Sequence, residues 1–316
     1  MRIGVDLGGT NIKVGAVNDK GEIVFQNTRP TKAEKGVEAI VKDIIEQIEE
    51  ILQRTNISRE QLQSIGIGVP GLVEKSTGKI IHLTNLFLDN VDLGQKIQAY
   101  FHKPTFVDND ATVAGLAEKI AGSTQGVKNS IFITLGTGVG GGIIINDKVY
   151  NGGHGWGSEI GHIVVGENFY DCNCGRNGCL ETFASATALI RYVKKRIEEG
   201  KKESFILEKV GGKIDQIEGK TIIDAAREGD ILAKEAMDRL IQYLAIGIVN
   251  LLNVLDPEKV VIGGGLSKAG DFLLNPLKEE VQKRLSFKEV TYGDIVLARL
   301  GNDAGIIGAA FLGENV

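Results

Sequence analysis

The amino-acid sequence predicts an α/β fold made of two related domains, with a sheet in each domain and a cleft between them. Three observations support this prediction: expected strands alternate with amphipathic helices, one strand-turn-strand pattern occurs twice, and glycine is abundant. The chain has 316 residues, of which 42 are glycine and 5 are proline. A chain of this length favours about two domains, and alternating strands and helices are typical of α/β proteins.

Apolar patterning predicts the individual elements. Runs of β-branched residues predict strands, and apolar residues that recur every three or four positions predict helices with one buried stripe. The expected strands are 3–7, 12–17, 64–69 and 259–262, and the expected helices are 34–54, 111–121, 185–199, 231–255 and 303–312. The charged segment near 200–220 is expected to be a connection. Small residues in the last helix would let it pack closely against its neighbours.

The first strand-turn-strand pattern recurs in the second half of the chain. Laying Ile3–Lys20 over Ile131–Lys148, at a constant offset of 128 residues, matches the first strand, the glycine turn and the Asn-Asp-Lys hairpin that ends the pattern. A repeat of this length indicates two domains of related fold. Two unrelated hairpins with the same turn chemistry are the alternative, but they would not explain the strands on each side.

The charge balance is mildly acidic, with 36 basic against 41 acidic residues and a net charge of −5. Nucleic-acid-binding domains usually carry a basic surface, so we expect no nucleic-acid partner. The most apolar stretch, Leu240–Leu255, is interrupted by Gln242, Asn250 and Asn253 and is short for a membrane span. The N-terminus lacks the long apolar region of a signal peptide. These features favour a cytoplasmic protein without membrane contact.

Two glycine motifs imitate known phosphate-binding signatures, but neither has the required context. Gly136-x-Gly138-x-x-Gly141 fits the dinucleotide fingerprint, which needs a helix after it, whereas a strand is expected there. Gly219-Lys220-Thr221 imitates the end of a P-loop, but Ile214 stands where the first glycine should be. We therefore reject both interpretations.

The two glycine turns of the repeat are instead candidate phosphate-binding hairpins. The first is Asp6-Leu7-Gly8-Gly9-Thr10, and the second is Leu135-Gly136-Thr137-Gly138. Backbone N–H groups in such turns bind phosphate oxygens. Asp6 is a candidate ligand for a metal ion, and Lys13 would offset phosphate charge. Ordinary tight turns are the alternative, and the second copy of the motif weighs against it.

The cysteines of the chain are clustered. All three lie within eight residues, as Cys172-x-Cys174 and Cys179, and His162 lies ten residues before the first of them. An odd number of cysteines in a cytoplasmic chain argues against a disulfide framework. Zinc in structural sites takes four nitrogen or sulfur ligands. His162 and the three cysteines are therefore a candidate zinc site.

Acidic residues follow one of the expected strands, in the run Val107-Asp108-Asn109-Asp110. Phosphoryl transfer to a hydroxyl needs a carboxylate within hydrogen-bonding distance of the attacking oxygen. Asp110 is the candidate base, and Asn109 is a candidate ligand for a hydroxyl. Asp108 is the nearest rival, but it alternates away from Asp110 along the strand. A helix N-cap is the alternative role for Asp110, and the pattern alone weighs the two roles evenly.

Together these motifs resemble the ROK family of actin-like sugar kinases and repressors. Asp6–Lys13 resembles the first phosphate motif of that family. Leu135–His162 fits its long signature of a glycine-rich turn, Gly152-Gly153, Gly155 and Glu159-Ile160-Gly161-His162. Val261–Ser267 resembles its adenosine-contacting turn. The resemblance extends from residue 3 to residue 313.

The resemblance implies a fold and a role for particular residues. It implies two actin-like (ribonuclease H-like) domains, a smaller one of 1–118 plus 302–316 and a larger one of 119–301 that carries the zinc loop. The implied sugar ligands are Gly71, Asn85, Asn109, Asp110, Glu159, His162 and Glu181, with Asp110 as the base. The implied nucleotide ligands are Asp6, Gly8, Gly9, Thr10, Asn11, Lys13, Gly136, Thr137, Gly138, Gly264, Gly265 and Leu266. The implied zinc ligands are His162, Cys172, Cys174 and Cys179, with the second ring nitrogen of His162 directed to the sugar.

The implied activity is ATP-dependent phosphorylation of glucose to glucose 6-phosphate, with Mg²⁺ and a structural Zn²⁺. The run Cys179–Ser185 resembles the glucokinase branch of the family more than the fructokinase or amino-sugar branches. Kinases for fructose, mannose or an N-acetylated amino sugar are alternatives. A sugar-sensing repressor would carry a DNA-binding domain before the first motif, which begins here at residue 3, and an actin-like filament protein would not explain the zinc cluster. By the same resemblance we expect a dimer or tetramer.

Overall fold

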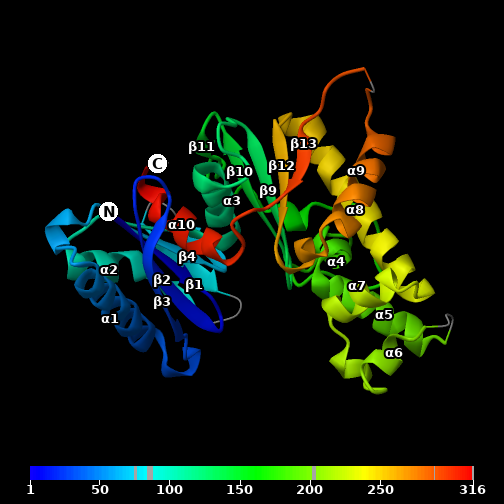
Figure 1. Cartoon of the computed structure of the whole chain (residues 1–316), viewed down its shortest axis with the longest axis horizontal. Helices are drawn as coiled ribbons and strands as arrows, with labels where there is room; N and C mark the ends of the chain where they lie inside the picture. The colour runs from blue at the N-terminus through cyan, green and yellow to red at the C-terminus, as the bar shows by residue number, and fades with distance from the viewer. Residues whose placement is uncertain (75–76, 84–87, 201–203, 288, 315–316) are drawn as a thin grey trace. The chain divides into compact units, whose positions relative to one another are not determined.

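The computed structural model describes the chain except for residues 75–76, 84–87, 201–203, 288 and 315–316. The chain divides into two compact units (Figure 1). The first unit contains residues 1–132, 142–158 and 298–316, and the second contains residues 133–141 and 159–297. The N-terminal strand and the last helix therefore belong to the same unit. The actin-like domain limits expected from the sequence stay a prediction.

The first unit is built on a five-stranded sheet with the order β3-β2-β1-β4-β8. Its strands are β1 (Arg2–Leu7), β2 (Asn11–Val17), β3 (Ile23–Pro30), β4 (Ile65–Val69) and β8 (Thr105–Asn109). β1 pairs antiparallel with β2 and parallel with β4, and β4 pairs parallel with β8. The carboxyl ends of β1, β4 and β8 thus lie at one edge of the sheet, which is where open α/β sheets bind ligands.

Helices cover both faces of this sheet. α1 (Val37–Thr55) and α2 (Leu93–Phe101) share one core with Ile3, Val5 and Leu7, the residues that alternate onto one face of β1. α3 (Asp110–Ala121) and α10 (Ala304–Ala310) form a second core with residues that include Val17 and Ile306. The periodic stripe of α1 was expected from the sequence because its apolar positions repeat at helical spacing.

Glycines allow α10 to contact its neighbours backbone to backbone. A Cβ atom on Gly4 or Gly66 would clash with the carbonyl oxygen of Ile306 or Ala309, respectively. A Cβ atom on Gly308 would clash with the carbonyl oxygen of Val113 in α3. The close packing of the last helix, expected from its small residues, is confirmed.

The second sheet repeats the plan of the first. Its order is β11-β10-β9-β12-β13, with strands β9 (Ser130–Leu135), β10 (Val139–Ile145), β11 (Lys148–Val149), β12 (Lys259–Gly263) and β13 (Asp294–Leu297). The bounds of β9 and β10 are those of β1 and β2 shifted by 128 residues. β12 pairs parallel with β13, as β4 pairs with β8. The internal repeat is therefore confirmed.

A small antiparallel sheet, β5-β6-β7, lies between β4 and α2 in the sequence and was not expected. Its strands are β5 (Gly71–Glu74), β6 (Lys79–Leu83) and β7 (Leu88–Val91). β6 pairs with both of its neighbours. This sheet is relevant to the site because its first residue is Gly71.

The helices of the second unit pack around α8 (Ile231–Leu255). They are α4 (Glu181–Ala184), α5 (Ala186–Glu198), α7 (Gly219–Arg227) and α9 (Asp271–Arg284), with the short α6 (Ile206–Lys209) against α7. The bounds of α8 agree with the sequence-based prediction. The charged segment near 200–220, expected to be a connection, contains the short α6 and the start of α7.

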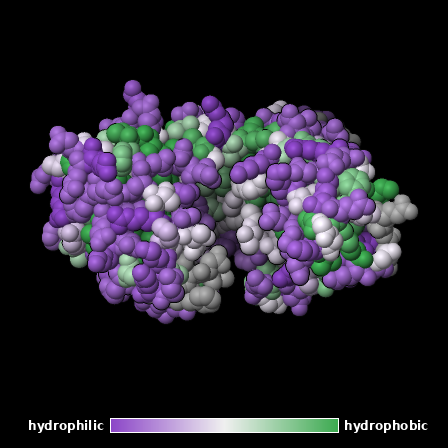
Figure 2. Space-filling model, turned by 60° about the horizontal axis from the view of Figure 1, so that its bottom comes forward, coloured by the Kyte–Doolittle hydropathy of each residue, from purple (hydrophilic) through white to green (hydrophobic). Residues whose placement is uncertain are grey.

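Length and composition alone would let α8 cross a membrane, contrary to the expectation from the sequence. However, 50% of its most apolar window is buried inside the protein, and Leu240, Leu244 and Ile248 are among its buried residues. The core helix of a globular protein has the same composition. On the face shown in Figure 2, hydrophobic residues form small groups on a largely hydrophilic surface.

Candidate functional site

The first glycine hairpin connects β1 to β2, and Thr31 supports it. The N–H of Gly8 donates to the carbonyl oxygen of Asn11 at 2.9 Å. The N–H of Thr31 donates to the carbonyl oxygen of Thr10 at 2.9 Å, and its hydroxyl donates to that of Gly8 at 2.6 Å. Thr31 is buried, whereas Gly9, Thr10 and Asn11 are exposed at the tip. The tip is thus open to a ligand, and no sequence pattern indicated the supporting role of Thr31.

Asp6 and Lys13 lie opposite each other on β1 and β2. Lys13 Nζ donates to Asp6 Oδ2 at 3.2 Å, and the two side chains are 29% and 24% exposed, respectively. Gly305, at the start of α10, leaves room for the carboxylate, because a Cβ atom there would lie 2.6 Å from Asp6 Cγ. One edge of the sheet therefore offers a carboxylate that suits a cation beside an ammonium group that suits a phosphate.

The proposed base follows the carboxyl end of β8. Asn109, not Asp110, is the N-cap of α3: its Oδ1 accepts from the N–H groups of Ala111 and Thr112. Its Nδ2 donates to the carbonyl oxygen of Gly71 at 3.1 Å. Asp110 is the first residue of the helix and is exposed. The alternative of Asp110 as the N-cap is therefore resolved in favour of Asn109.

Asp108 and Gly71 have structural constraints of their own. Asp108 is 5% exposed and its Oδ1 accepts from the N–H of Asn109 at 2.6 Å. Burial makes it a poorer candidate than Asp110 for contact with a substrate. A Cβ atom on Gly71 would clash with the carbonyl oxygen of His82, so the strand pairing requires glycine there. Asn85, the remaining sugar candidate of this unit, lies outside the described residues.

The second glycine hairpin connects β9 to β10 and is held by the segment 181–187. Within the turn, the N–H of Gly136 donates to the carbonyl oxygen of Gly138 at 3.0 Å. The carbonyl oxygen of Gly136 accepts from the N–H of Ala186 at 2.8 Å, and that of Thr137 accepts from the hydroxyl of Thr187 at 2.7 Å. Thr137 is exposed at the tip. Like the first hairpin, this turn is held by hydrogen bonds from another segment of the chain, and its tip is exposed.

The expected adenosine turn contacts the root of this hairpin. Gly264 has a φ of +82°, and a Cβ atom on it would lie 2.5 Å from the carbonyl oxygen of Leu135. A residue with a side chain would be strained there both by the positive φ and by the contact with Leu135. Gly265 begins a short 3₁₀ helix, Gly265–Ala269. Leu266 is 5% exposed, so its backbone and not its side chain is what a nucleotide would meet.

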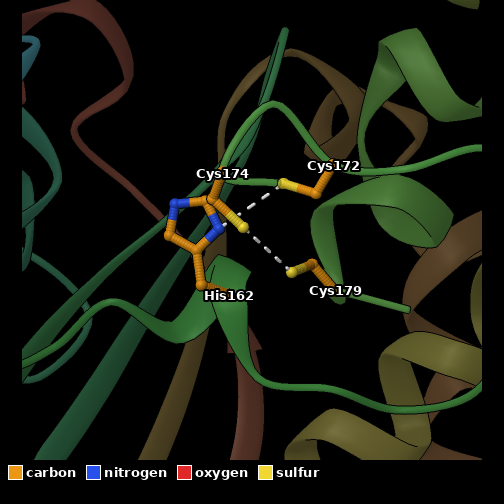
Figure 3. Close-up of side chains that lie close together, drawn as sticks. All are labelled: His162, Cys172, Cys174 and Cys179. Atoms are coloured by element: carbon orange, nitrogen blue, oxygen red, sulfur yellow. Dashed lines mark hydrogen bonds between the residues drawn. The ribbon is translucent and has the colours of Figure 1, made fainter. Parts of the chain in front are cut away.

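His162 and the three cysteines converge in the second unit (Figure 3). Their candidate ligand atoms all lie within 4.8 Å of one another. Cys172 Sγ is 3.6 Å from His162 Nδ1, and Cys174 Sγ is 3.5 Å from Cys179 Sγ. One nitrogen and three sulfurs at this spacing fit a tetrahedral structural zinc site. The predicted ligand set is thereby brought together from two separate segments.

The thiols of the cluster differ in their surroundings. A hydrogen bond from the backbone of Arg176 lowers the pKa of exposed Cys174 to about 6. Burial raises the pKa of Cys179 to about 12, and burial also raises that of Cys172. Zinc binds the thiolate form of cysteine. Among the candidate ligands, Cys174 is thus the one most readily available as a thiolate.

An arginine on α8 anchors the loop that carries the cluster. Arg239 Nη2 donates to Asn168 Oδ1 at 2.8 Å, and Asn168 Nδ2 donates to the carbonyl oxygen of Thr182 at 2.7 Å. The guanidinium also lies 4.6 Å from the ring centroid of Phe183 and 5.3 Å from that of Tyr243. Burial lowers the pKa of Arg239. No sequence pattern indicated this contact, since it joins residues 71 positions apart.

The remaining sugar candidates lie near the cluster. Glu159 is exposed and precedes a short 3₁₀ helix, Ile160–His162, that brings His162 to the cysteines. Because Nδ1 of His162 faces Cys172, Nε2 is the nitrogen left for a sugar hydroxyl. Glu181 Oε1 lies 3.9 Å from Cys172 Sγ. Their roles as sugar ligands stay predictions.

The sequence matches the ROK family over residues 2–315. This chain belongs to the ROK family. It is 40% identical to a glucokinase of Halalkalibacterium halodurans over 98% of this chain and 94% of that protein. It is also 33% identical to a xylose repressor of Caldicellulosiruptor bescii, over 97% of this chain but 76% of that protein.

A solved structure gives the same result. The ROK family glucokinase from Streptomyces griseus, in complex with glucose and AMPPNP, is 34% identical to this chain. It aligns with a TM-score of 0.82 over 98% of both chains. The predicted family and its actin-like α/β fold are therefore confirmed.

Proposed function

We propose that this protein is a glucokinase, which transfers the terminal phosphoryl group of ATP to glucose and releases glucose 6-phosphate and ADP. The observation that carries the proposal is the 40% identity, over nearly the whole chain, to a curated glucokinase. The structural match to a glucokinase that holds glucose and an ATP analogue supports it. Similarity to xylose repressors is lower and leaves about a quarter of their length without a counterpart.

In this proposal Asp110 accepts the proton of the attacking sugar hydroxyl. Its exposure at the first position of α3 leaves the carboxylate accessible to a substrate, and a positioned carboxylate is the usual general base for such a transfer. Asn109 binds a neighbouring hydroxyl through the second hydrogen of its Nδ2 atom, while the first remains on the carbonyl oxygen of Gly71.

The two hairpins bind the phosphates of ATP in the same proposal. Their exposed tips present backbone N–H groups, which suit phosphate oxygens, and Lys13 adds a positive charge. Asp6 holds Mg²⁺, directly or through water. The turn at Gly264 contacts the adenosine. Since phosphoryl transfer relies on positioning and on charge compensation, these residues supply most of what the reaction requires from the protein.

We further propose that His162, Cys172, Cys174 and Cys179 hold zinc. The spacing of their ligand atoms supports this assignment. Zinc supplies no chemistry to the transfer; it fixes the loop that places Glu159, His162 and Glu181 beside the sugar. The protein would act in the cytoplasm, where ATP and reduced thiols are available, as a homodimer or homotetramer that light scattering can identify.

A substrate panel tests the proposed reaction. Purified protein with Mg-ATP is offered glucose, mannose, fructose, glucosamine and N-acetylated amino sugars at equal concentration, and ADP release is measured. We expect the highest kcat/KM for glucose. Efficient turnover of another hexose without turnover of glucose would reassign the substrate within the family, and absence of turnover with specific DNA binding would favour a repressor.

A further inference from the structure

Val139, the residue that follows the second glycine hairpin, contacts both of the segments that supply the candidate metal ligands. The N–H of Val139 donates to Glu181 Oε2 at 3.0 Å, and Glu181 stands two residues after the ligand Cys179. On the carbonyl side, a Cβ atom on Gly161 would clash with the oxygen of Val139, and Gly161 directly precedes the ligand His162. Both segments that supply the candidate metal ligands therefore contact the residue that follows the second glycine hairpin.

The two glycines of this hairpin differ in what surrounds them. A Cβ atom on Gly138 would clash with Glu181 Oε2. A Cβ atom on Gly136 would meet nothing within 4 Å. Neither has a positive φ, so alanine fits the backbone at both positions. The protein itself thus requires glycine at 138, whereas no protein atom excludes a Cβ atom at 136.

We propose that Glu181 is a positioning residue for the nucleotide hairpin, and that its carboxylate is the reason for glycine at position 138. Its hydrogen bond fixes the amide of Val139, and the contacts of Ala186 and Thr187 fix the carbonyl groups of the turn. Loss of this bond frees the hairpin and weakens nucleotide binding even when no sugar is present. This proposal rests on the proposed kinase function, and it goes beyond the predicted role of Glu181 as a sugar ligand.

Nucleotide affinity without sugar tests the proposal, because a residue that only binds sugar would not change it. Titration calorimetry with Mg²⁺ and the ATP analogue AMPPNP is applied to the wild type, Glu181→Ala and Glu181→Gln. A hydrogen bond to a charged acceptor implies that Glu181→Ala raises Kd about tenfold or more. Glu181→Gln keeps one acceptor oxygen, so we expect its Kd to stay within about threefold of the wild type.

A double-mutant cycle tests the reason for the glycine. Gly138→Ala should raise Kd in the wild-type background but change it little further in the Glu181→Ala background, since the clash is then gone. Gly136→Ala is the matched control, and its effect should be the same factor in both backgrounds. Thermal melts establish that each variant is folded.

The outcomes separate this proposal from the proposed function. If Gly138→Ala raises Kd by the same factor with and without Glu181, or if Glu181→Ala binds AMPPNP as the wild type does, the proposal is wrong while the kinase assignment stands. If the folded wild type does not bind AMPPNP, both are wrong.

Discussion

The side-chain amide of Asn109 joins the end of β8 to the start of β5, because its Nδ2 donates to the carbonyl oxygen of Gly71 at 3.1 Å. Its Oδ1 at the same time caps α3. Both ends of one short side chain are thus held by backbone groups. This arrangement fixes the junction that carries the proposed base Asp110, and a catalytic group needs such positioning.

Replacing Asp110 should abolish most of the turnover and leave glucose binding nearly intact. Asp110→Asn removes the proton acceptor but keeps the shape of the side chain, so kcat should fall about 10²-fold to 10⁴-fold. The Kd for glucose should stay within about threefold. Stopped assays and calorimetry measure the two quantities. Asp271→Asn is the matched control, because Asp271 is also the exposed first residue of a helix; a wild-type kcat in Asp110→Asn would exclude Asp110 as the base.

Removal of one sulfur should release the metal. Cys174→Ser leaves three ligands in the cluster, and a structural zinc site needs four. Elemental analysis should find zinc in the wild-type protein and little in the variant, together with a lower melting temperature. The adjacent exposed Asn173 provides the control, as Asn173→Ser should retain zinc. Equal zinc in both variants would contradict the assignment.

Substitution of Glu118 should cause a large loss of stability. Its carboxylate is fully buried in α3. Oε1 accepts from the N–H groups of Arg299 and Leu300, and Oε2 accepts from the N–H and hydroxyl of Ser123. Glu118→Ala removes the fully buried carboxylate that accepts all four of these hydrogen bonds, which should lower the free energy of unfolding by about 3 kcal/mol or more.

Urea denaturation measures this loss of stability. The exposed Glu279 of α9 is the control, and Glu279→Ala should change the free energy of unfolding by less than about 0.5 kcal/mol. Similar midpoints for both variants would show that the buried carboxylate does not hold the segment at 299–300.

The packing of α10 and the helix propensities of glycine and alanine predict opposite effects of Gly308→Ala on stability. Glycine to alanine in a helix usually stabilises by about 1 kcal/mol. At Gly308 the added methyl would meet the backbone of Val113, so Gly308→Ala should instead destabilise by about 1–3 kcal/mol. Thermal denaturation compares it with Gly153→Ala, where a Cβ atom would meet nothing within 4 Å. A stabilised Gly308→Ala protein would contradict the backbone contact.

The sequence was most informative where the signal is local. The bounds of α8 follow from a long apolar periodicity, and the cluster of Cys172, Cys174 and Cys179 is visible because its members are neighbours in the chain. By contrast, α9 buries only Leu273, Leu277 and Val281 along 14 residues. This helix was not expected from the sequence, and the proline inside it, Pro276, argues against a helix by residue type alone.

Contacts between distant residues could not be predicted in this way. Val139 and Glu181 are 42 positions apart, and only the folded chain shows that the glycine at 138 leaves room for a carboxylate. A glutamate in a helix is usually exposed, yet the side chain of Glu118 is buried and accepts hydrogen bonds from residues 299–300. Apolar periodicity predicts which face of an element is buried, but it does not predict which polar groups are buried with that face.

Phosphorylation of glucose by the purified wild-type protein is the most direct measurement. With Mg-ATP and glucose, we predict stoichiometric formation of ADP and glucose 6-phosphate, saturable in both substrates and reduced at least about 10²-fold in kcat by Asp110→Asn. No glucose 6-phosphate from folded, zinc-loaded protein, at any concentration of glucose and Mg-ATP, would contradict the proposed function.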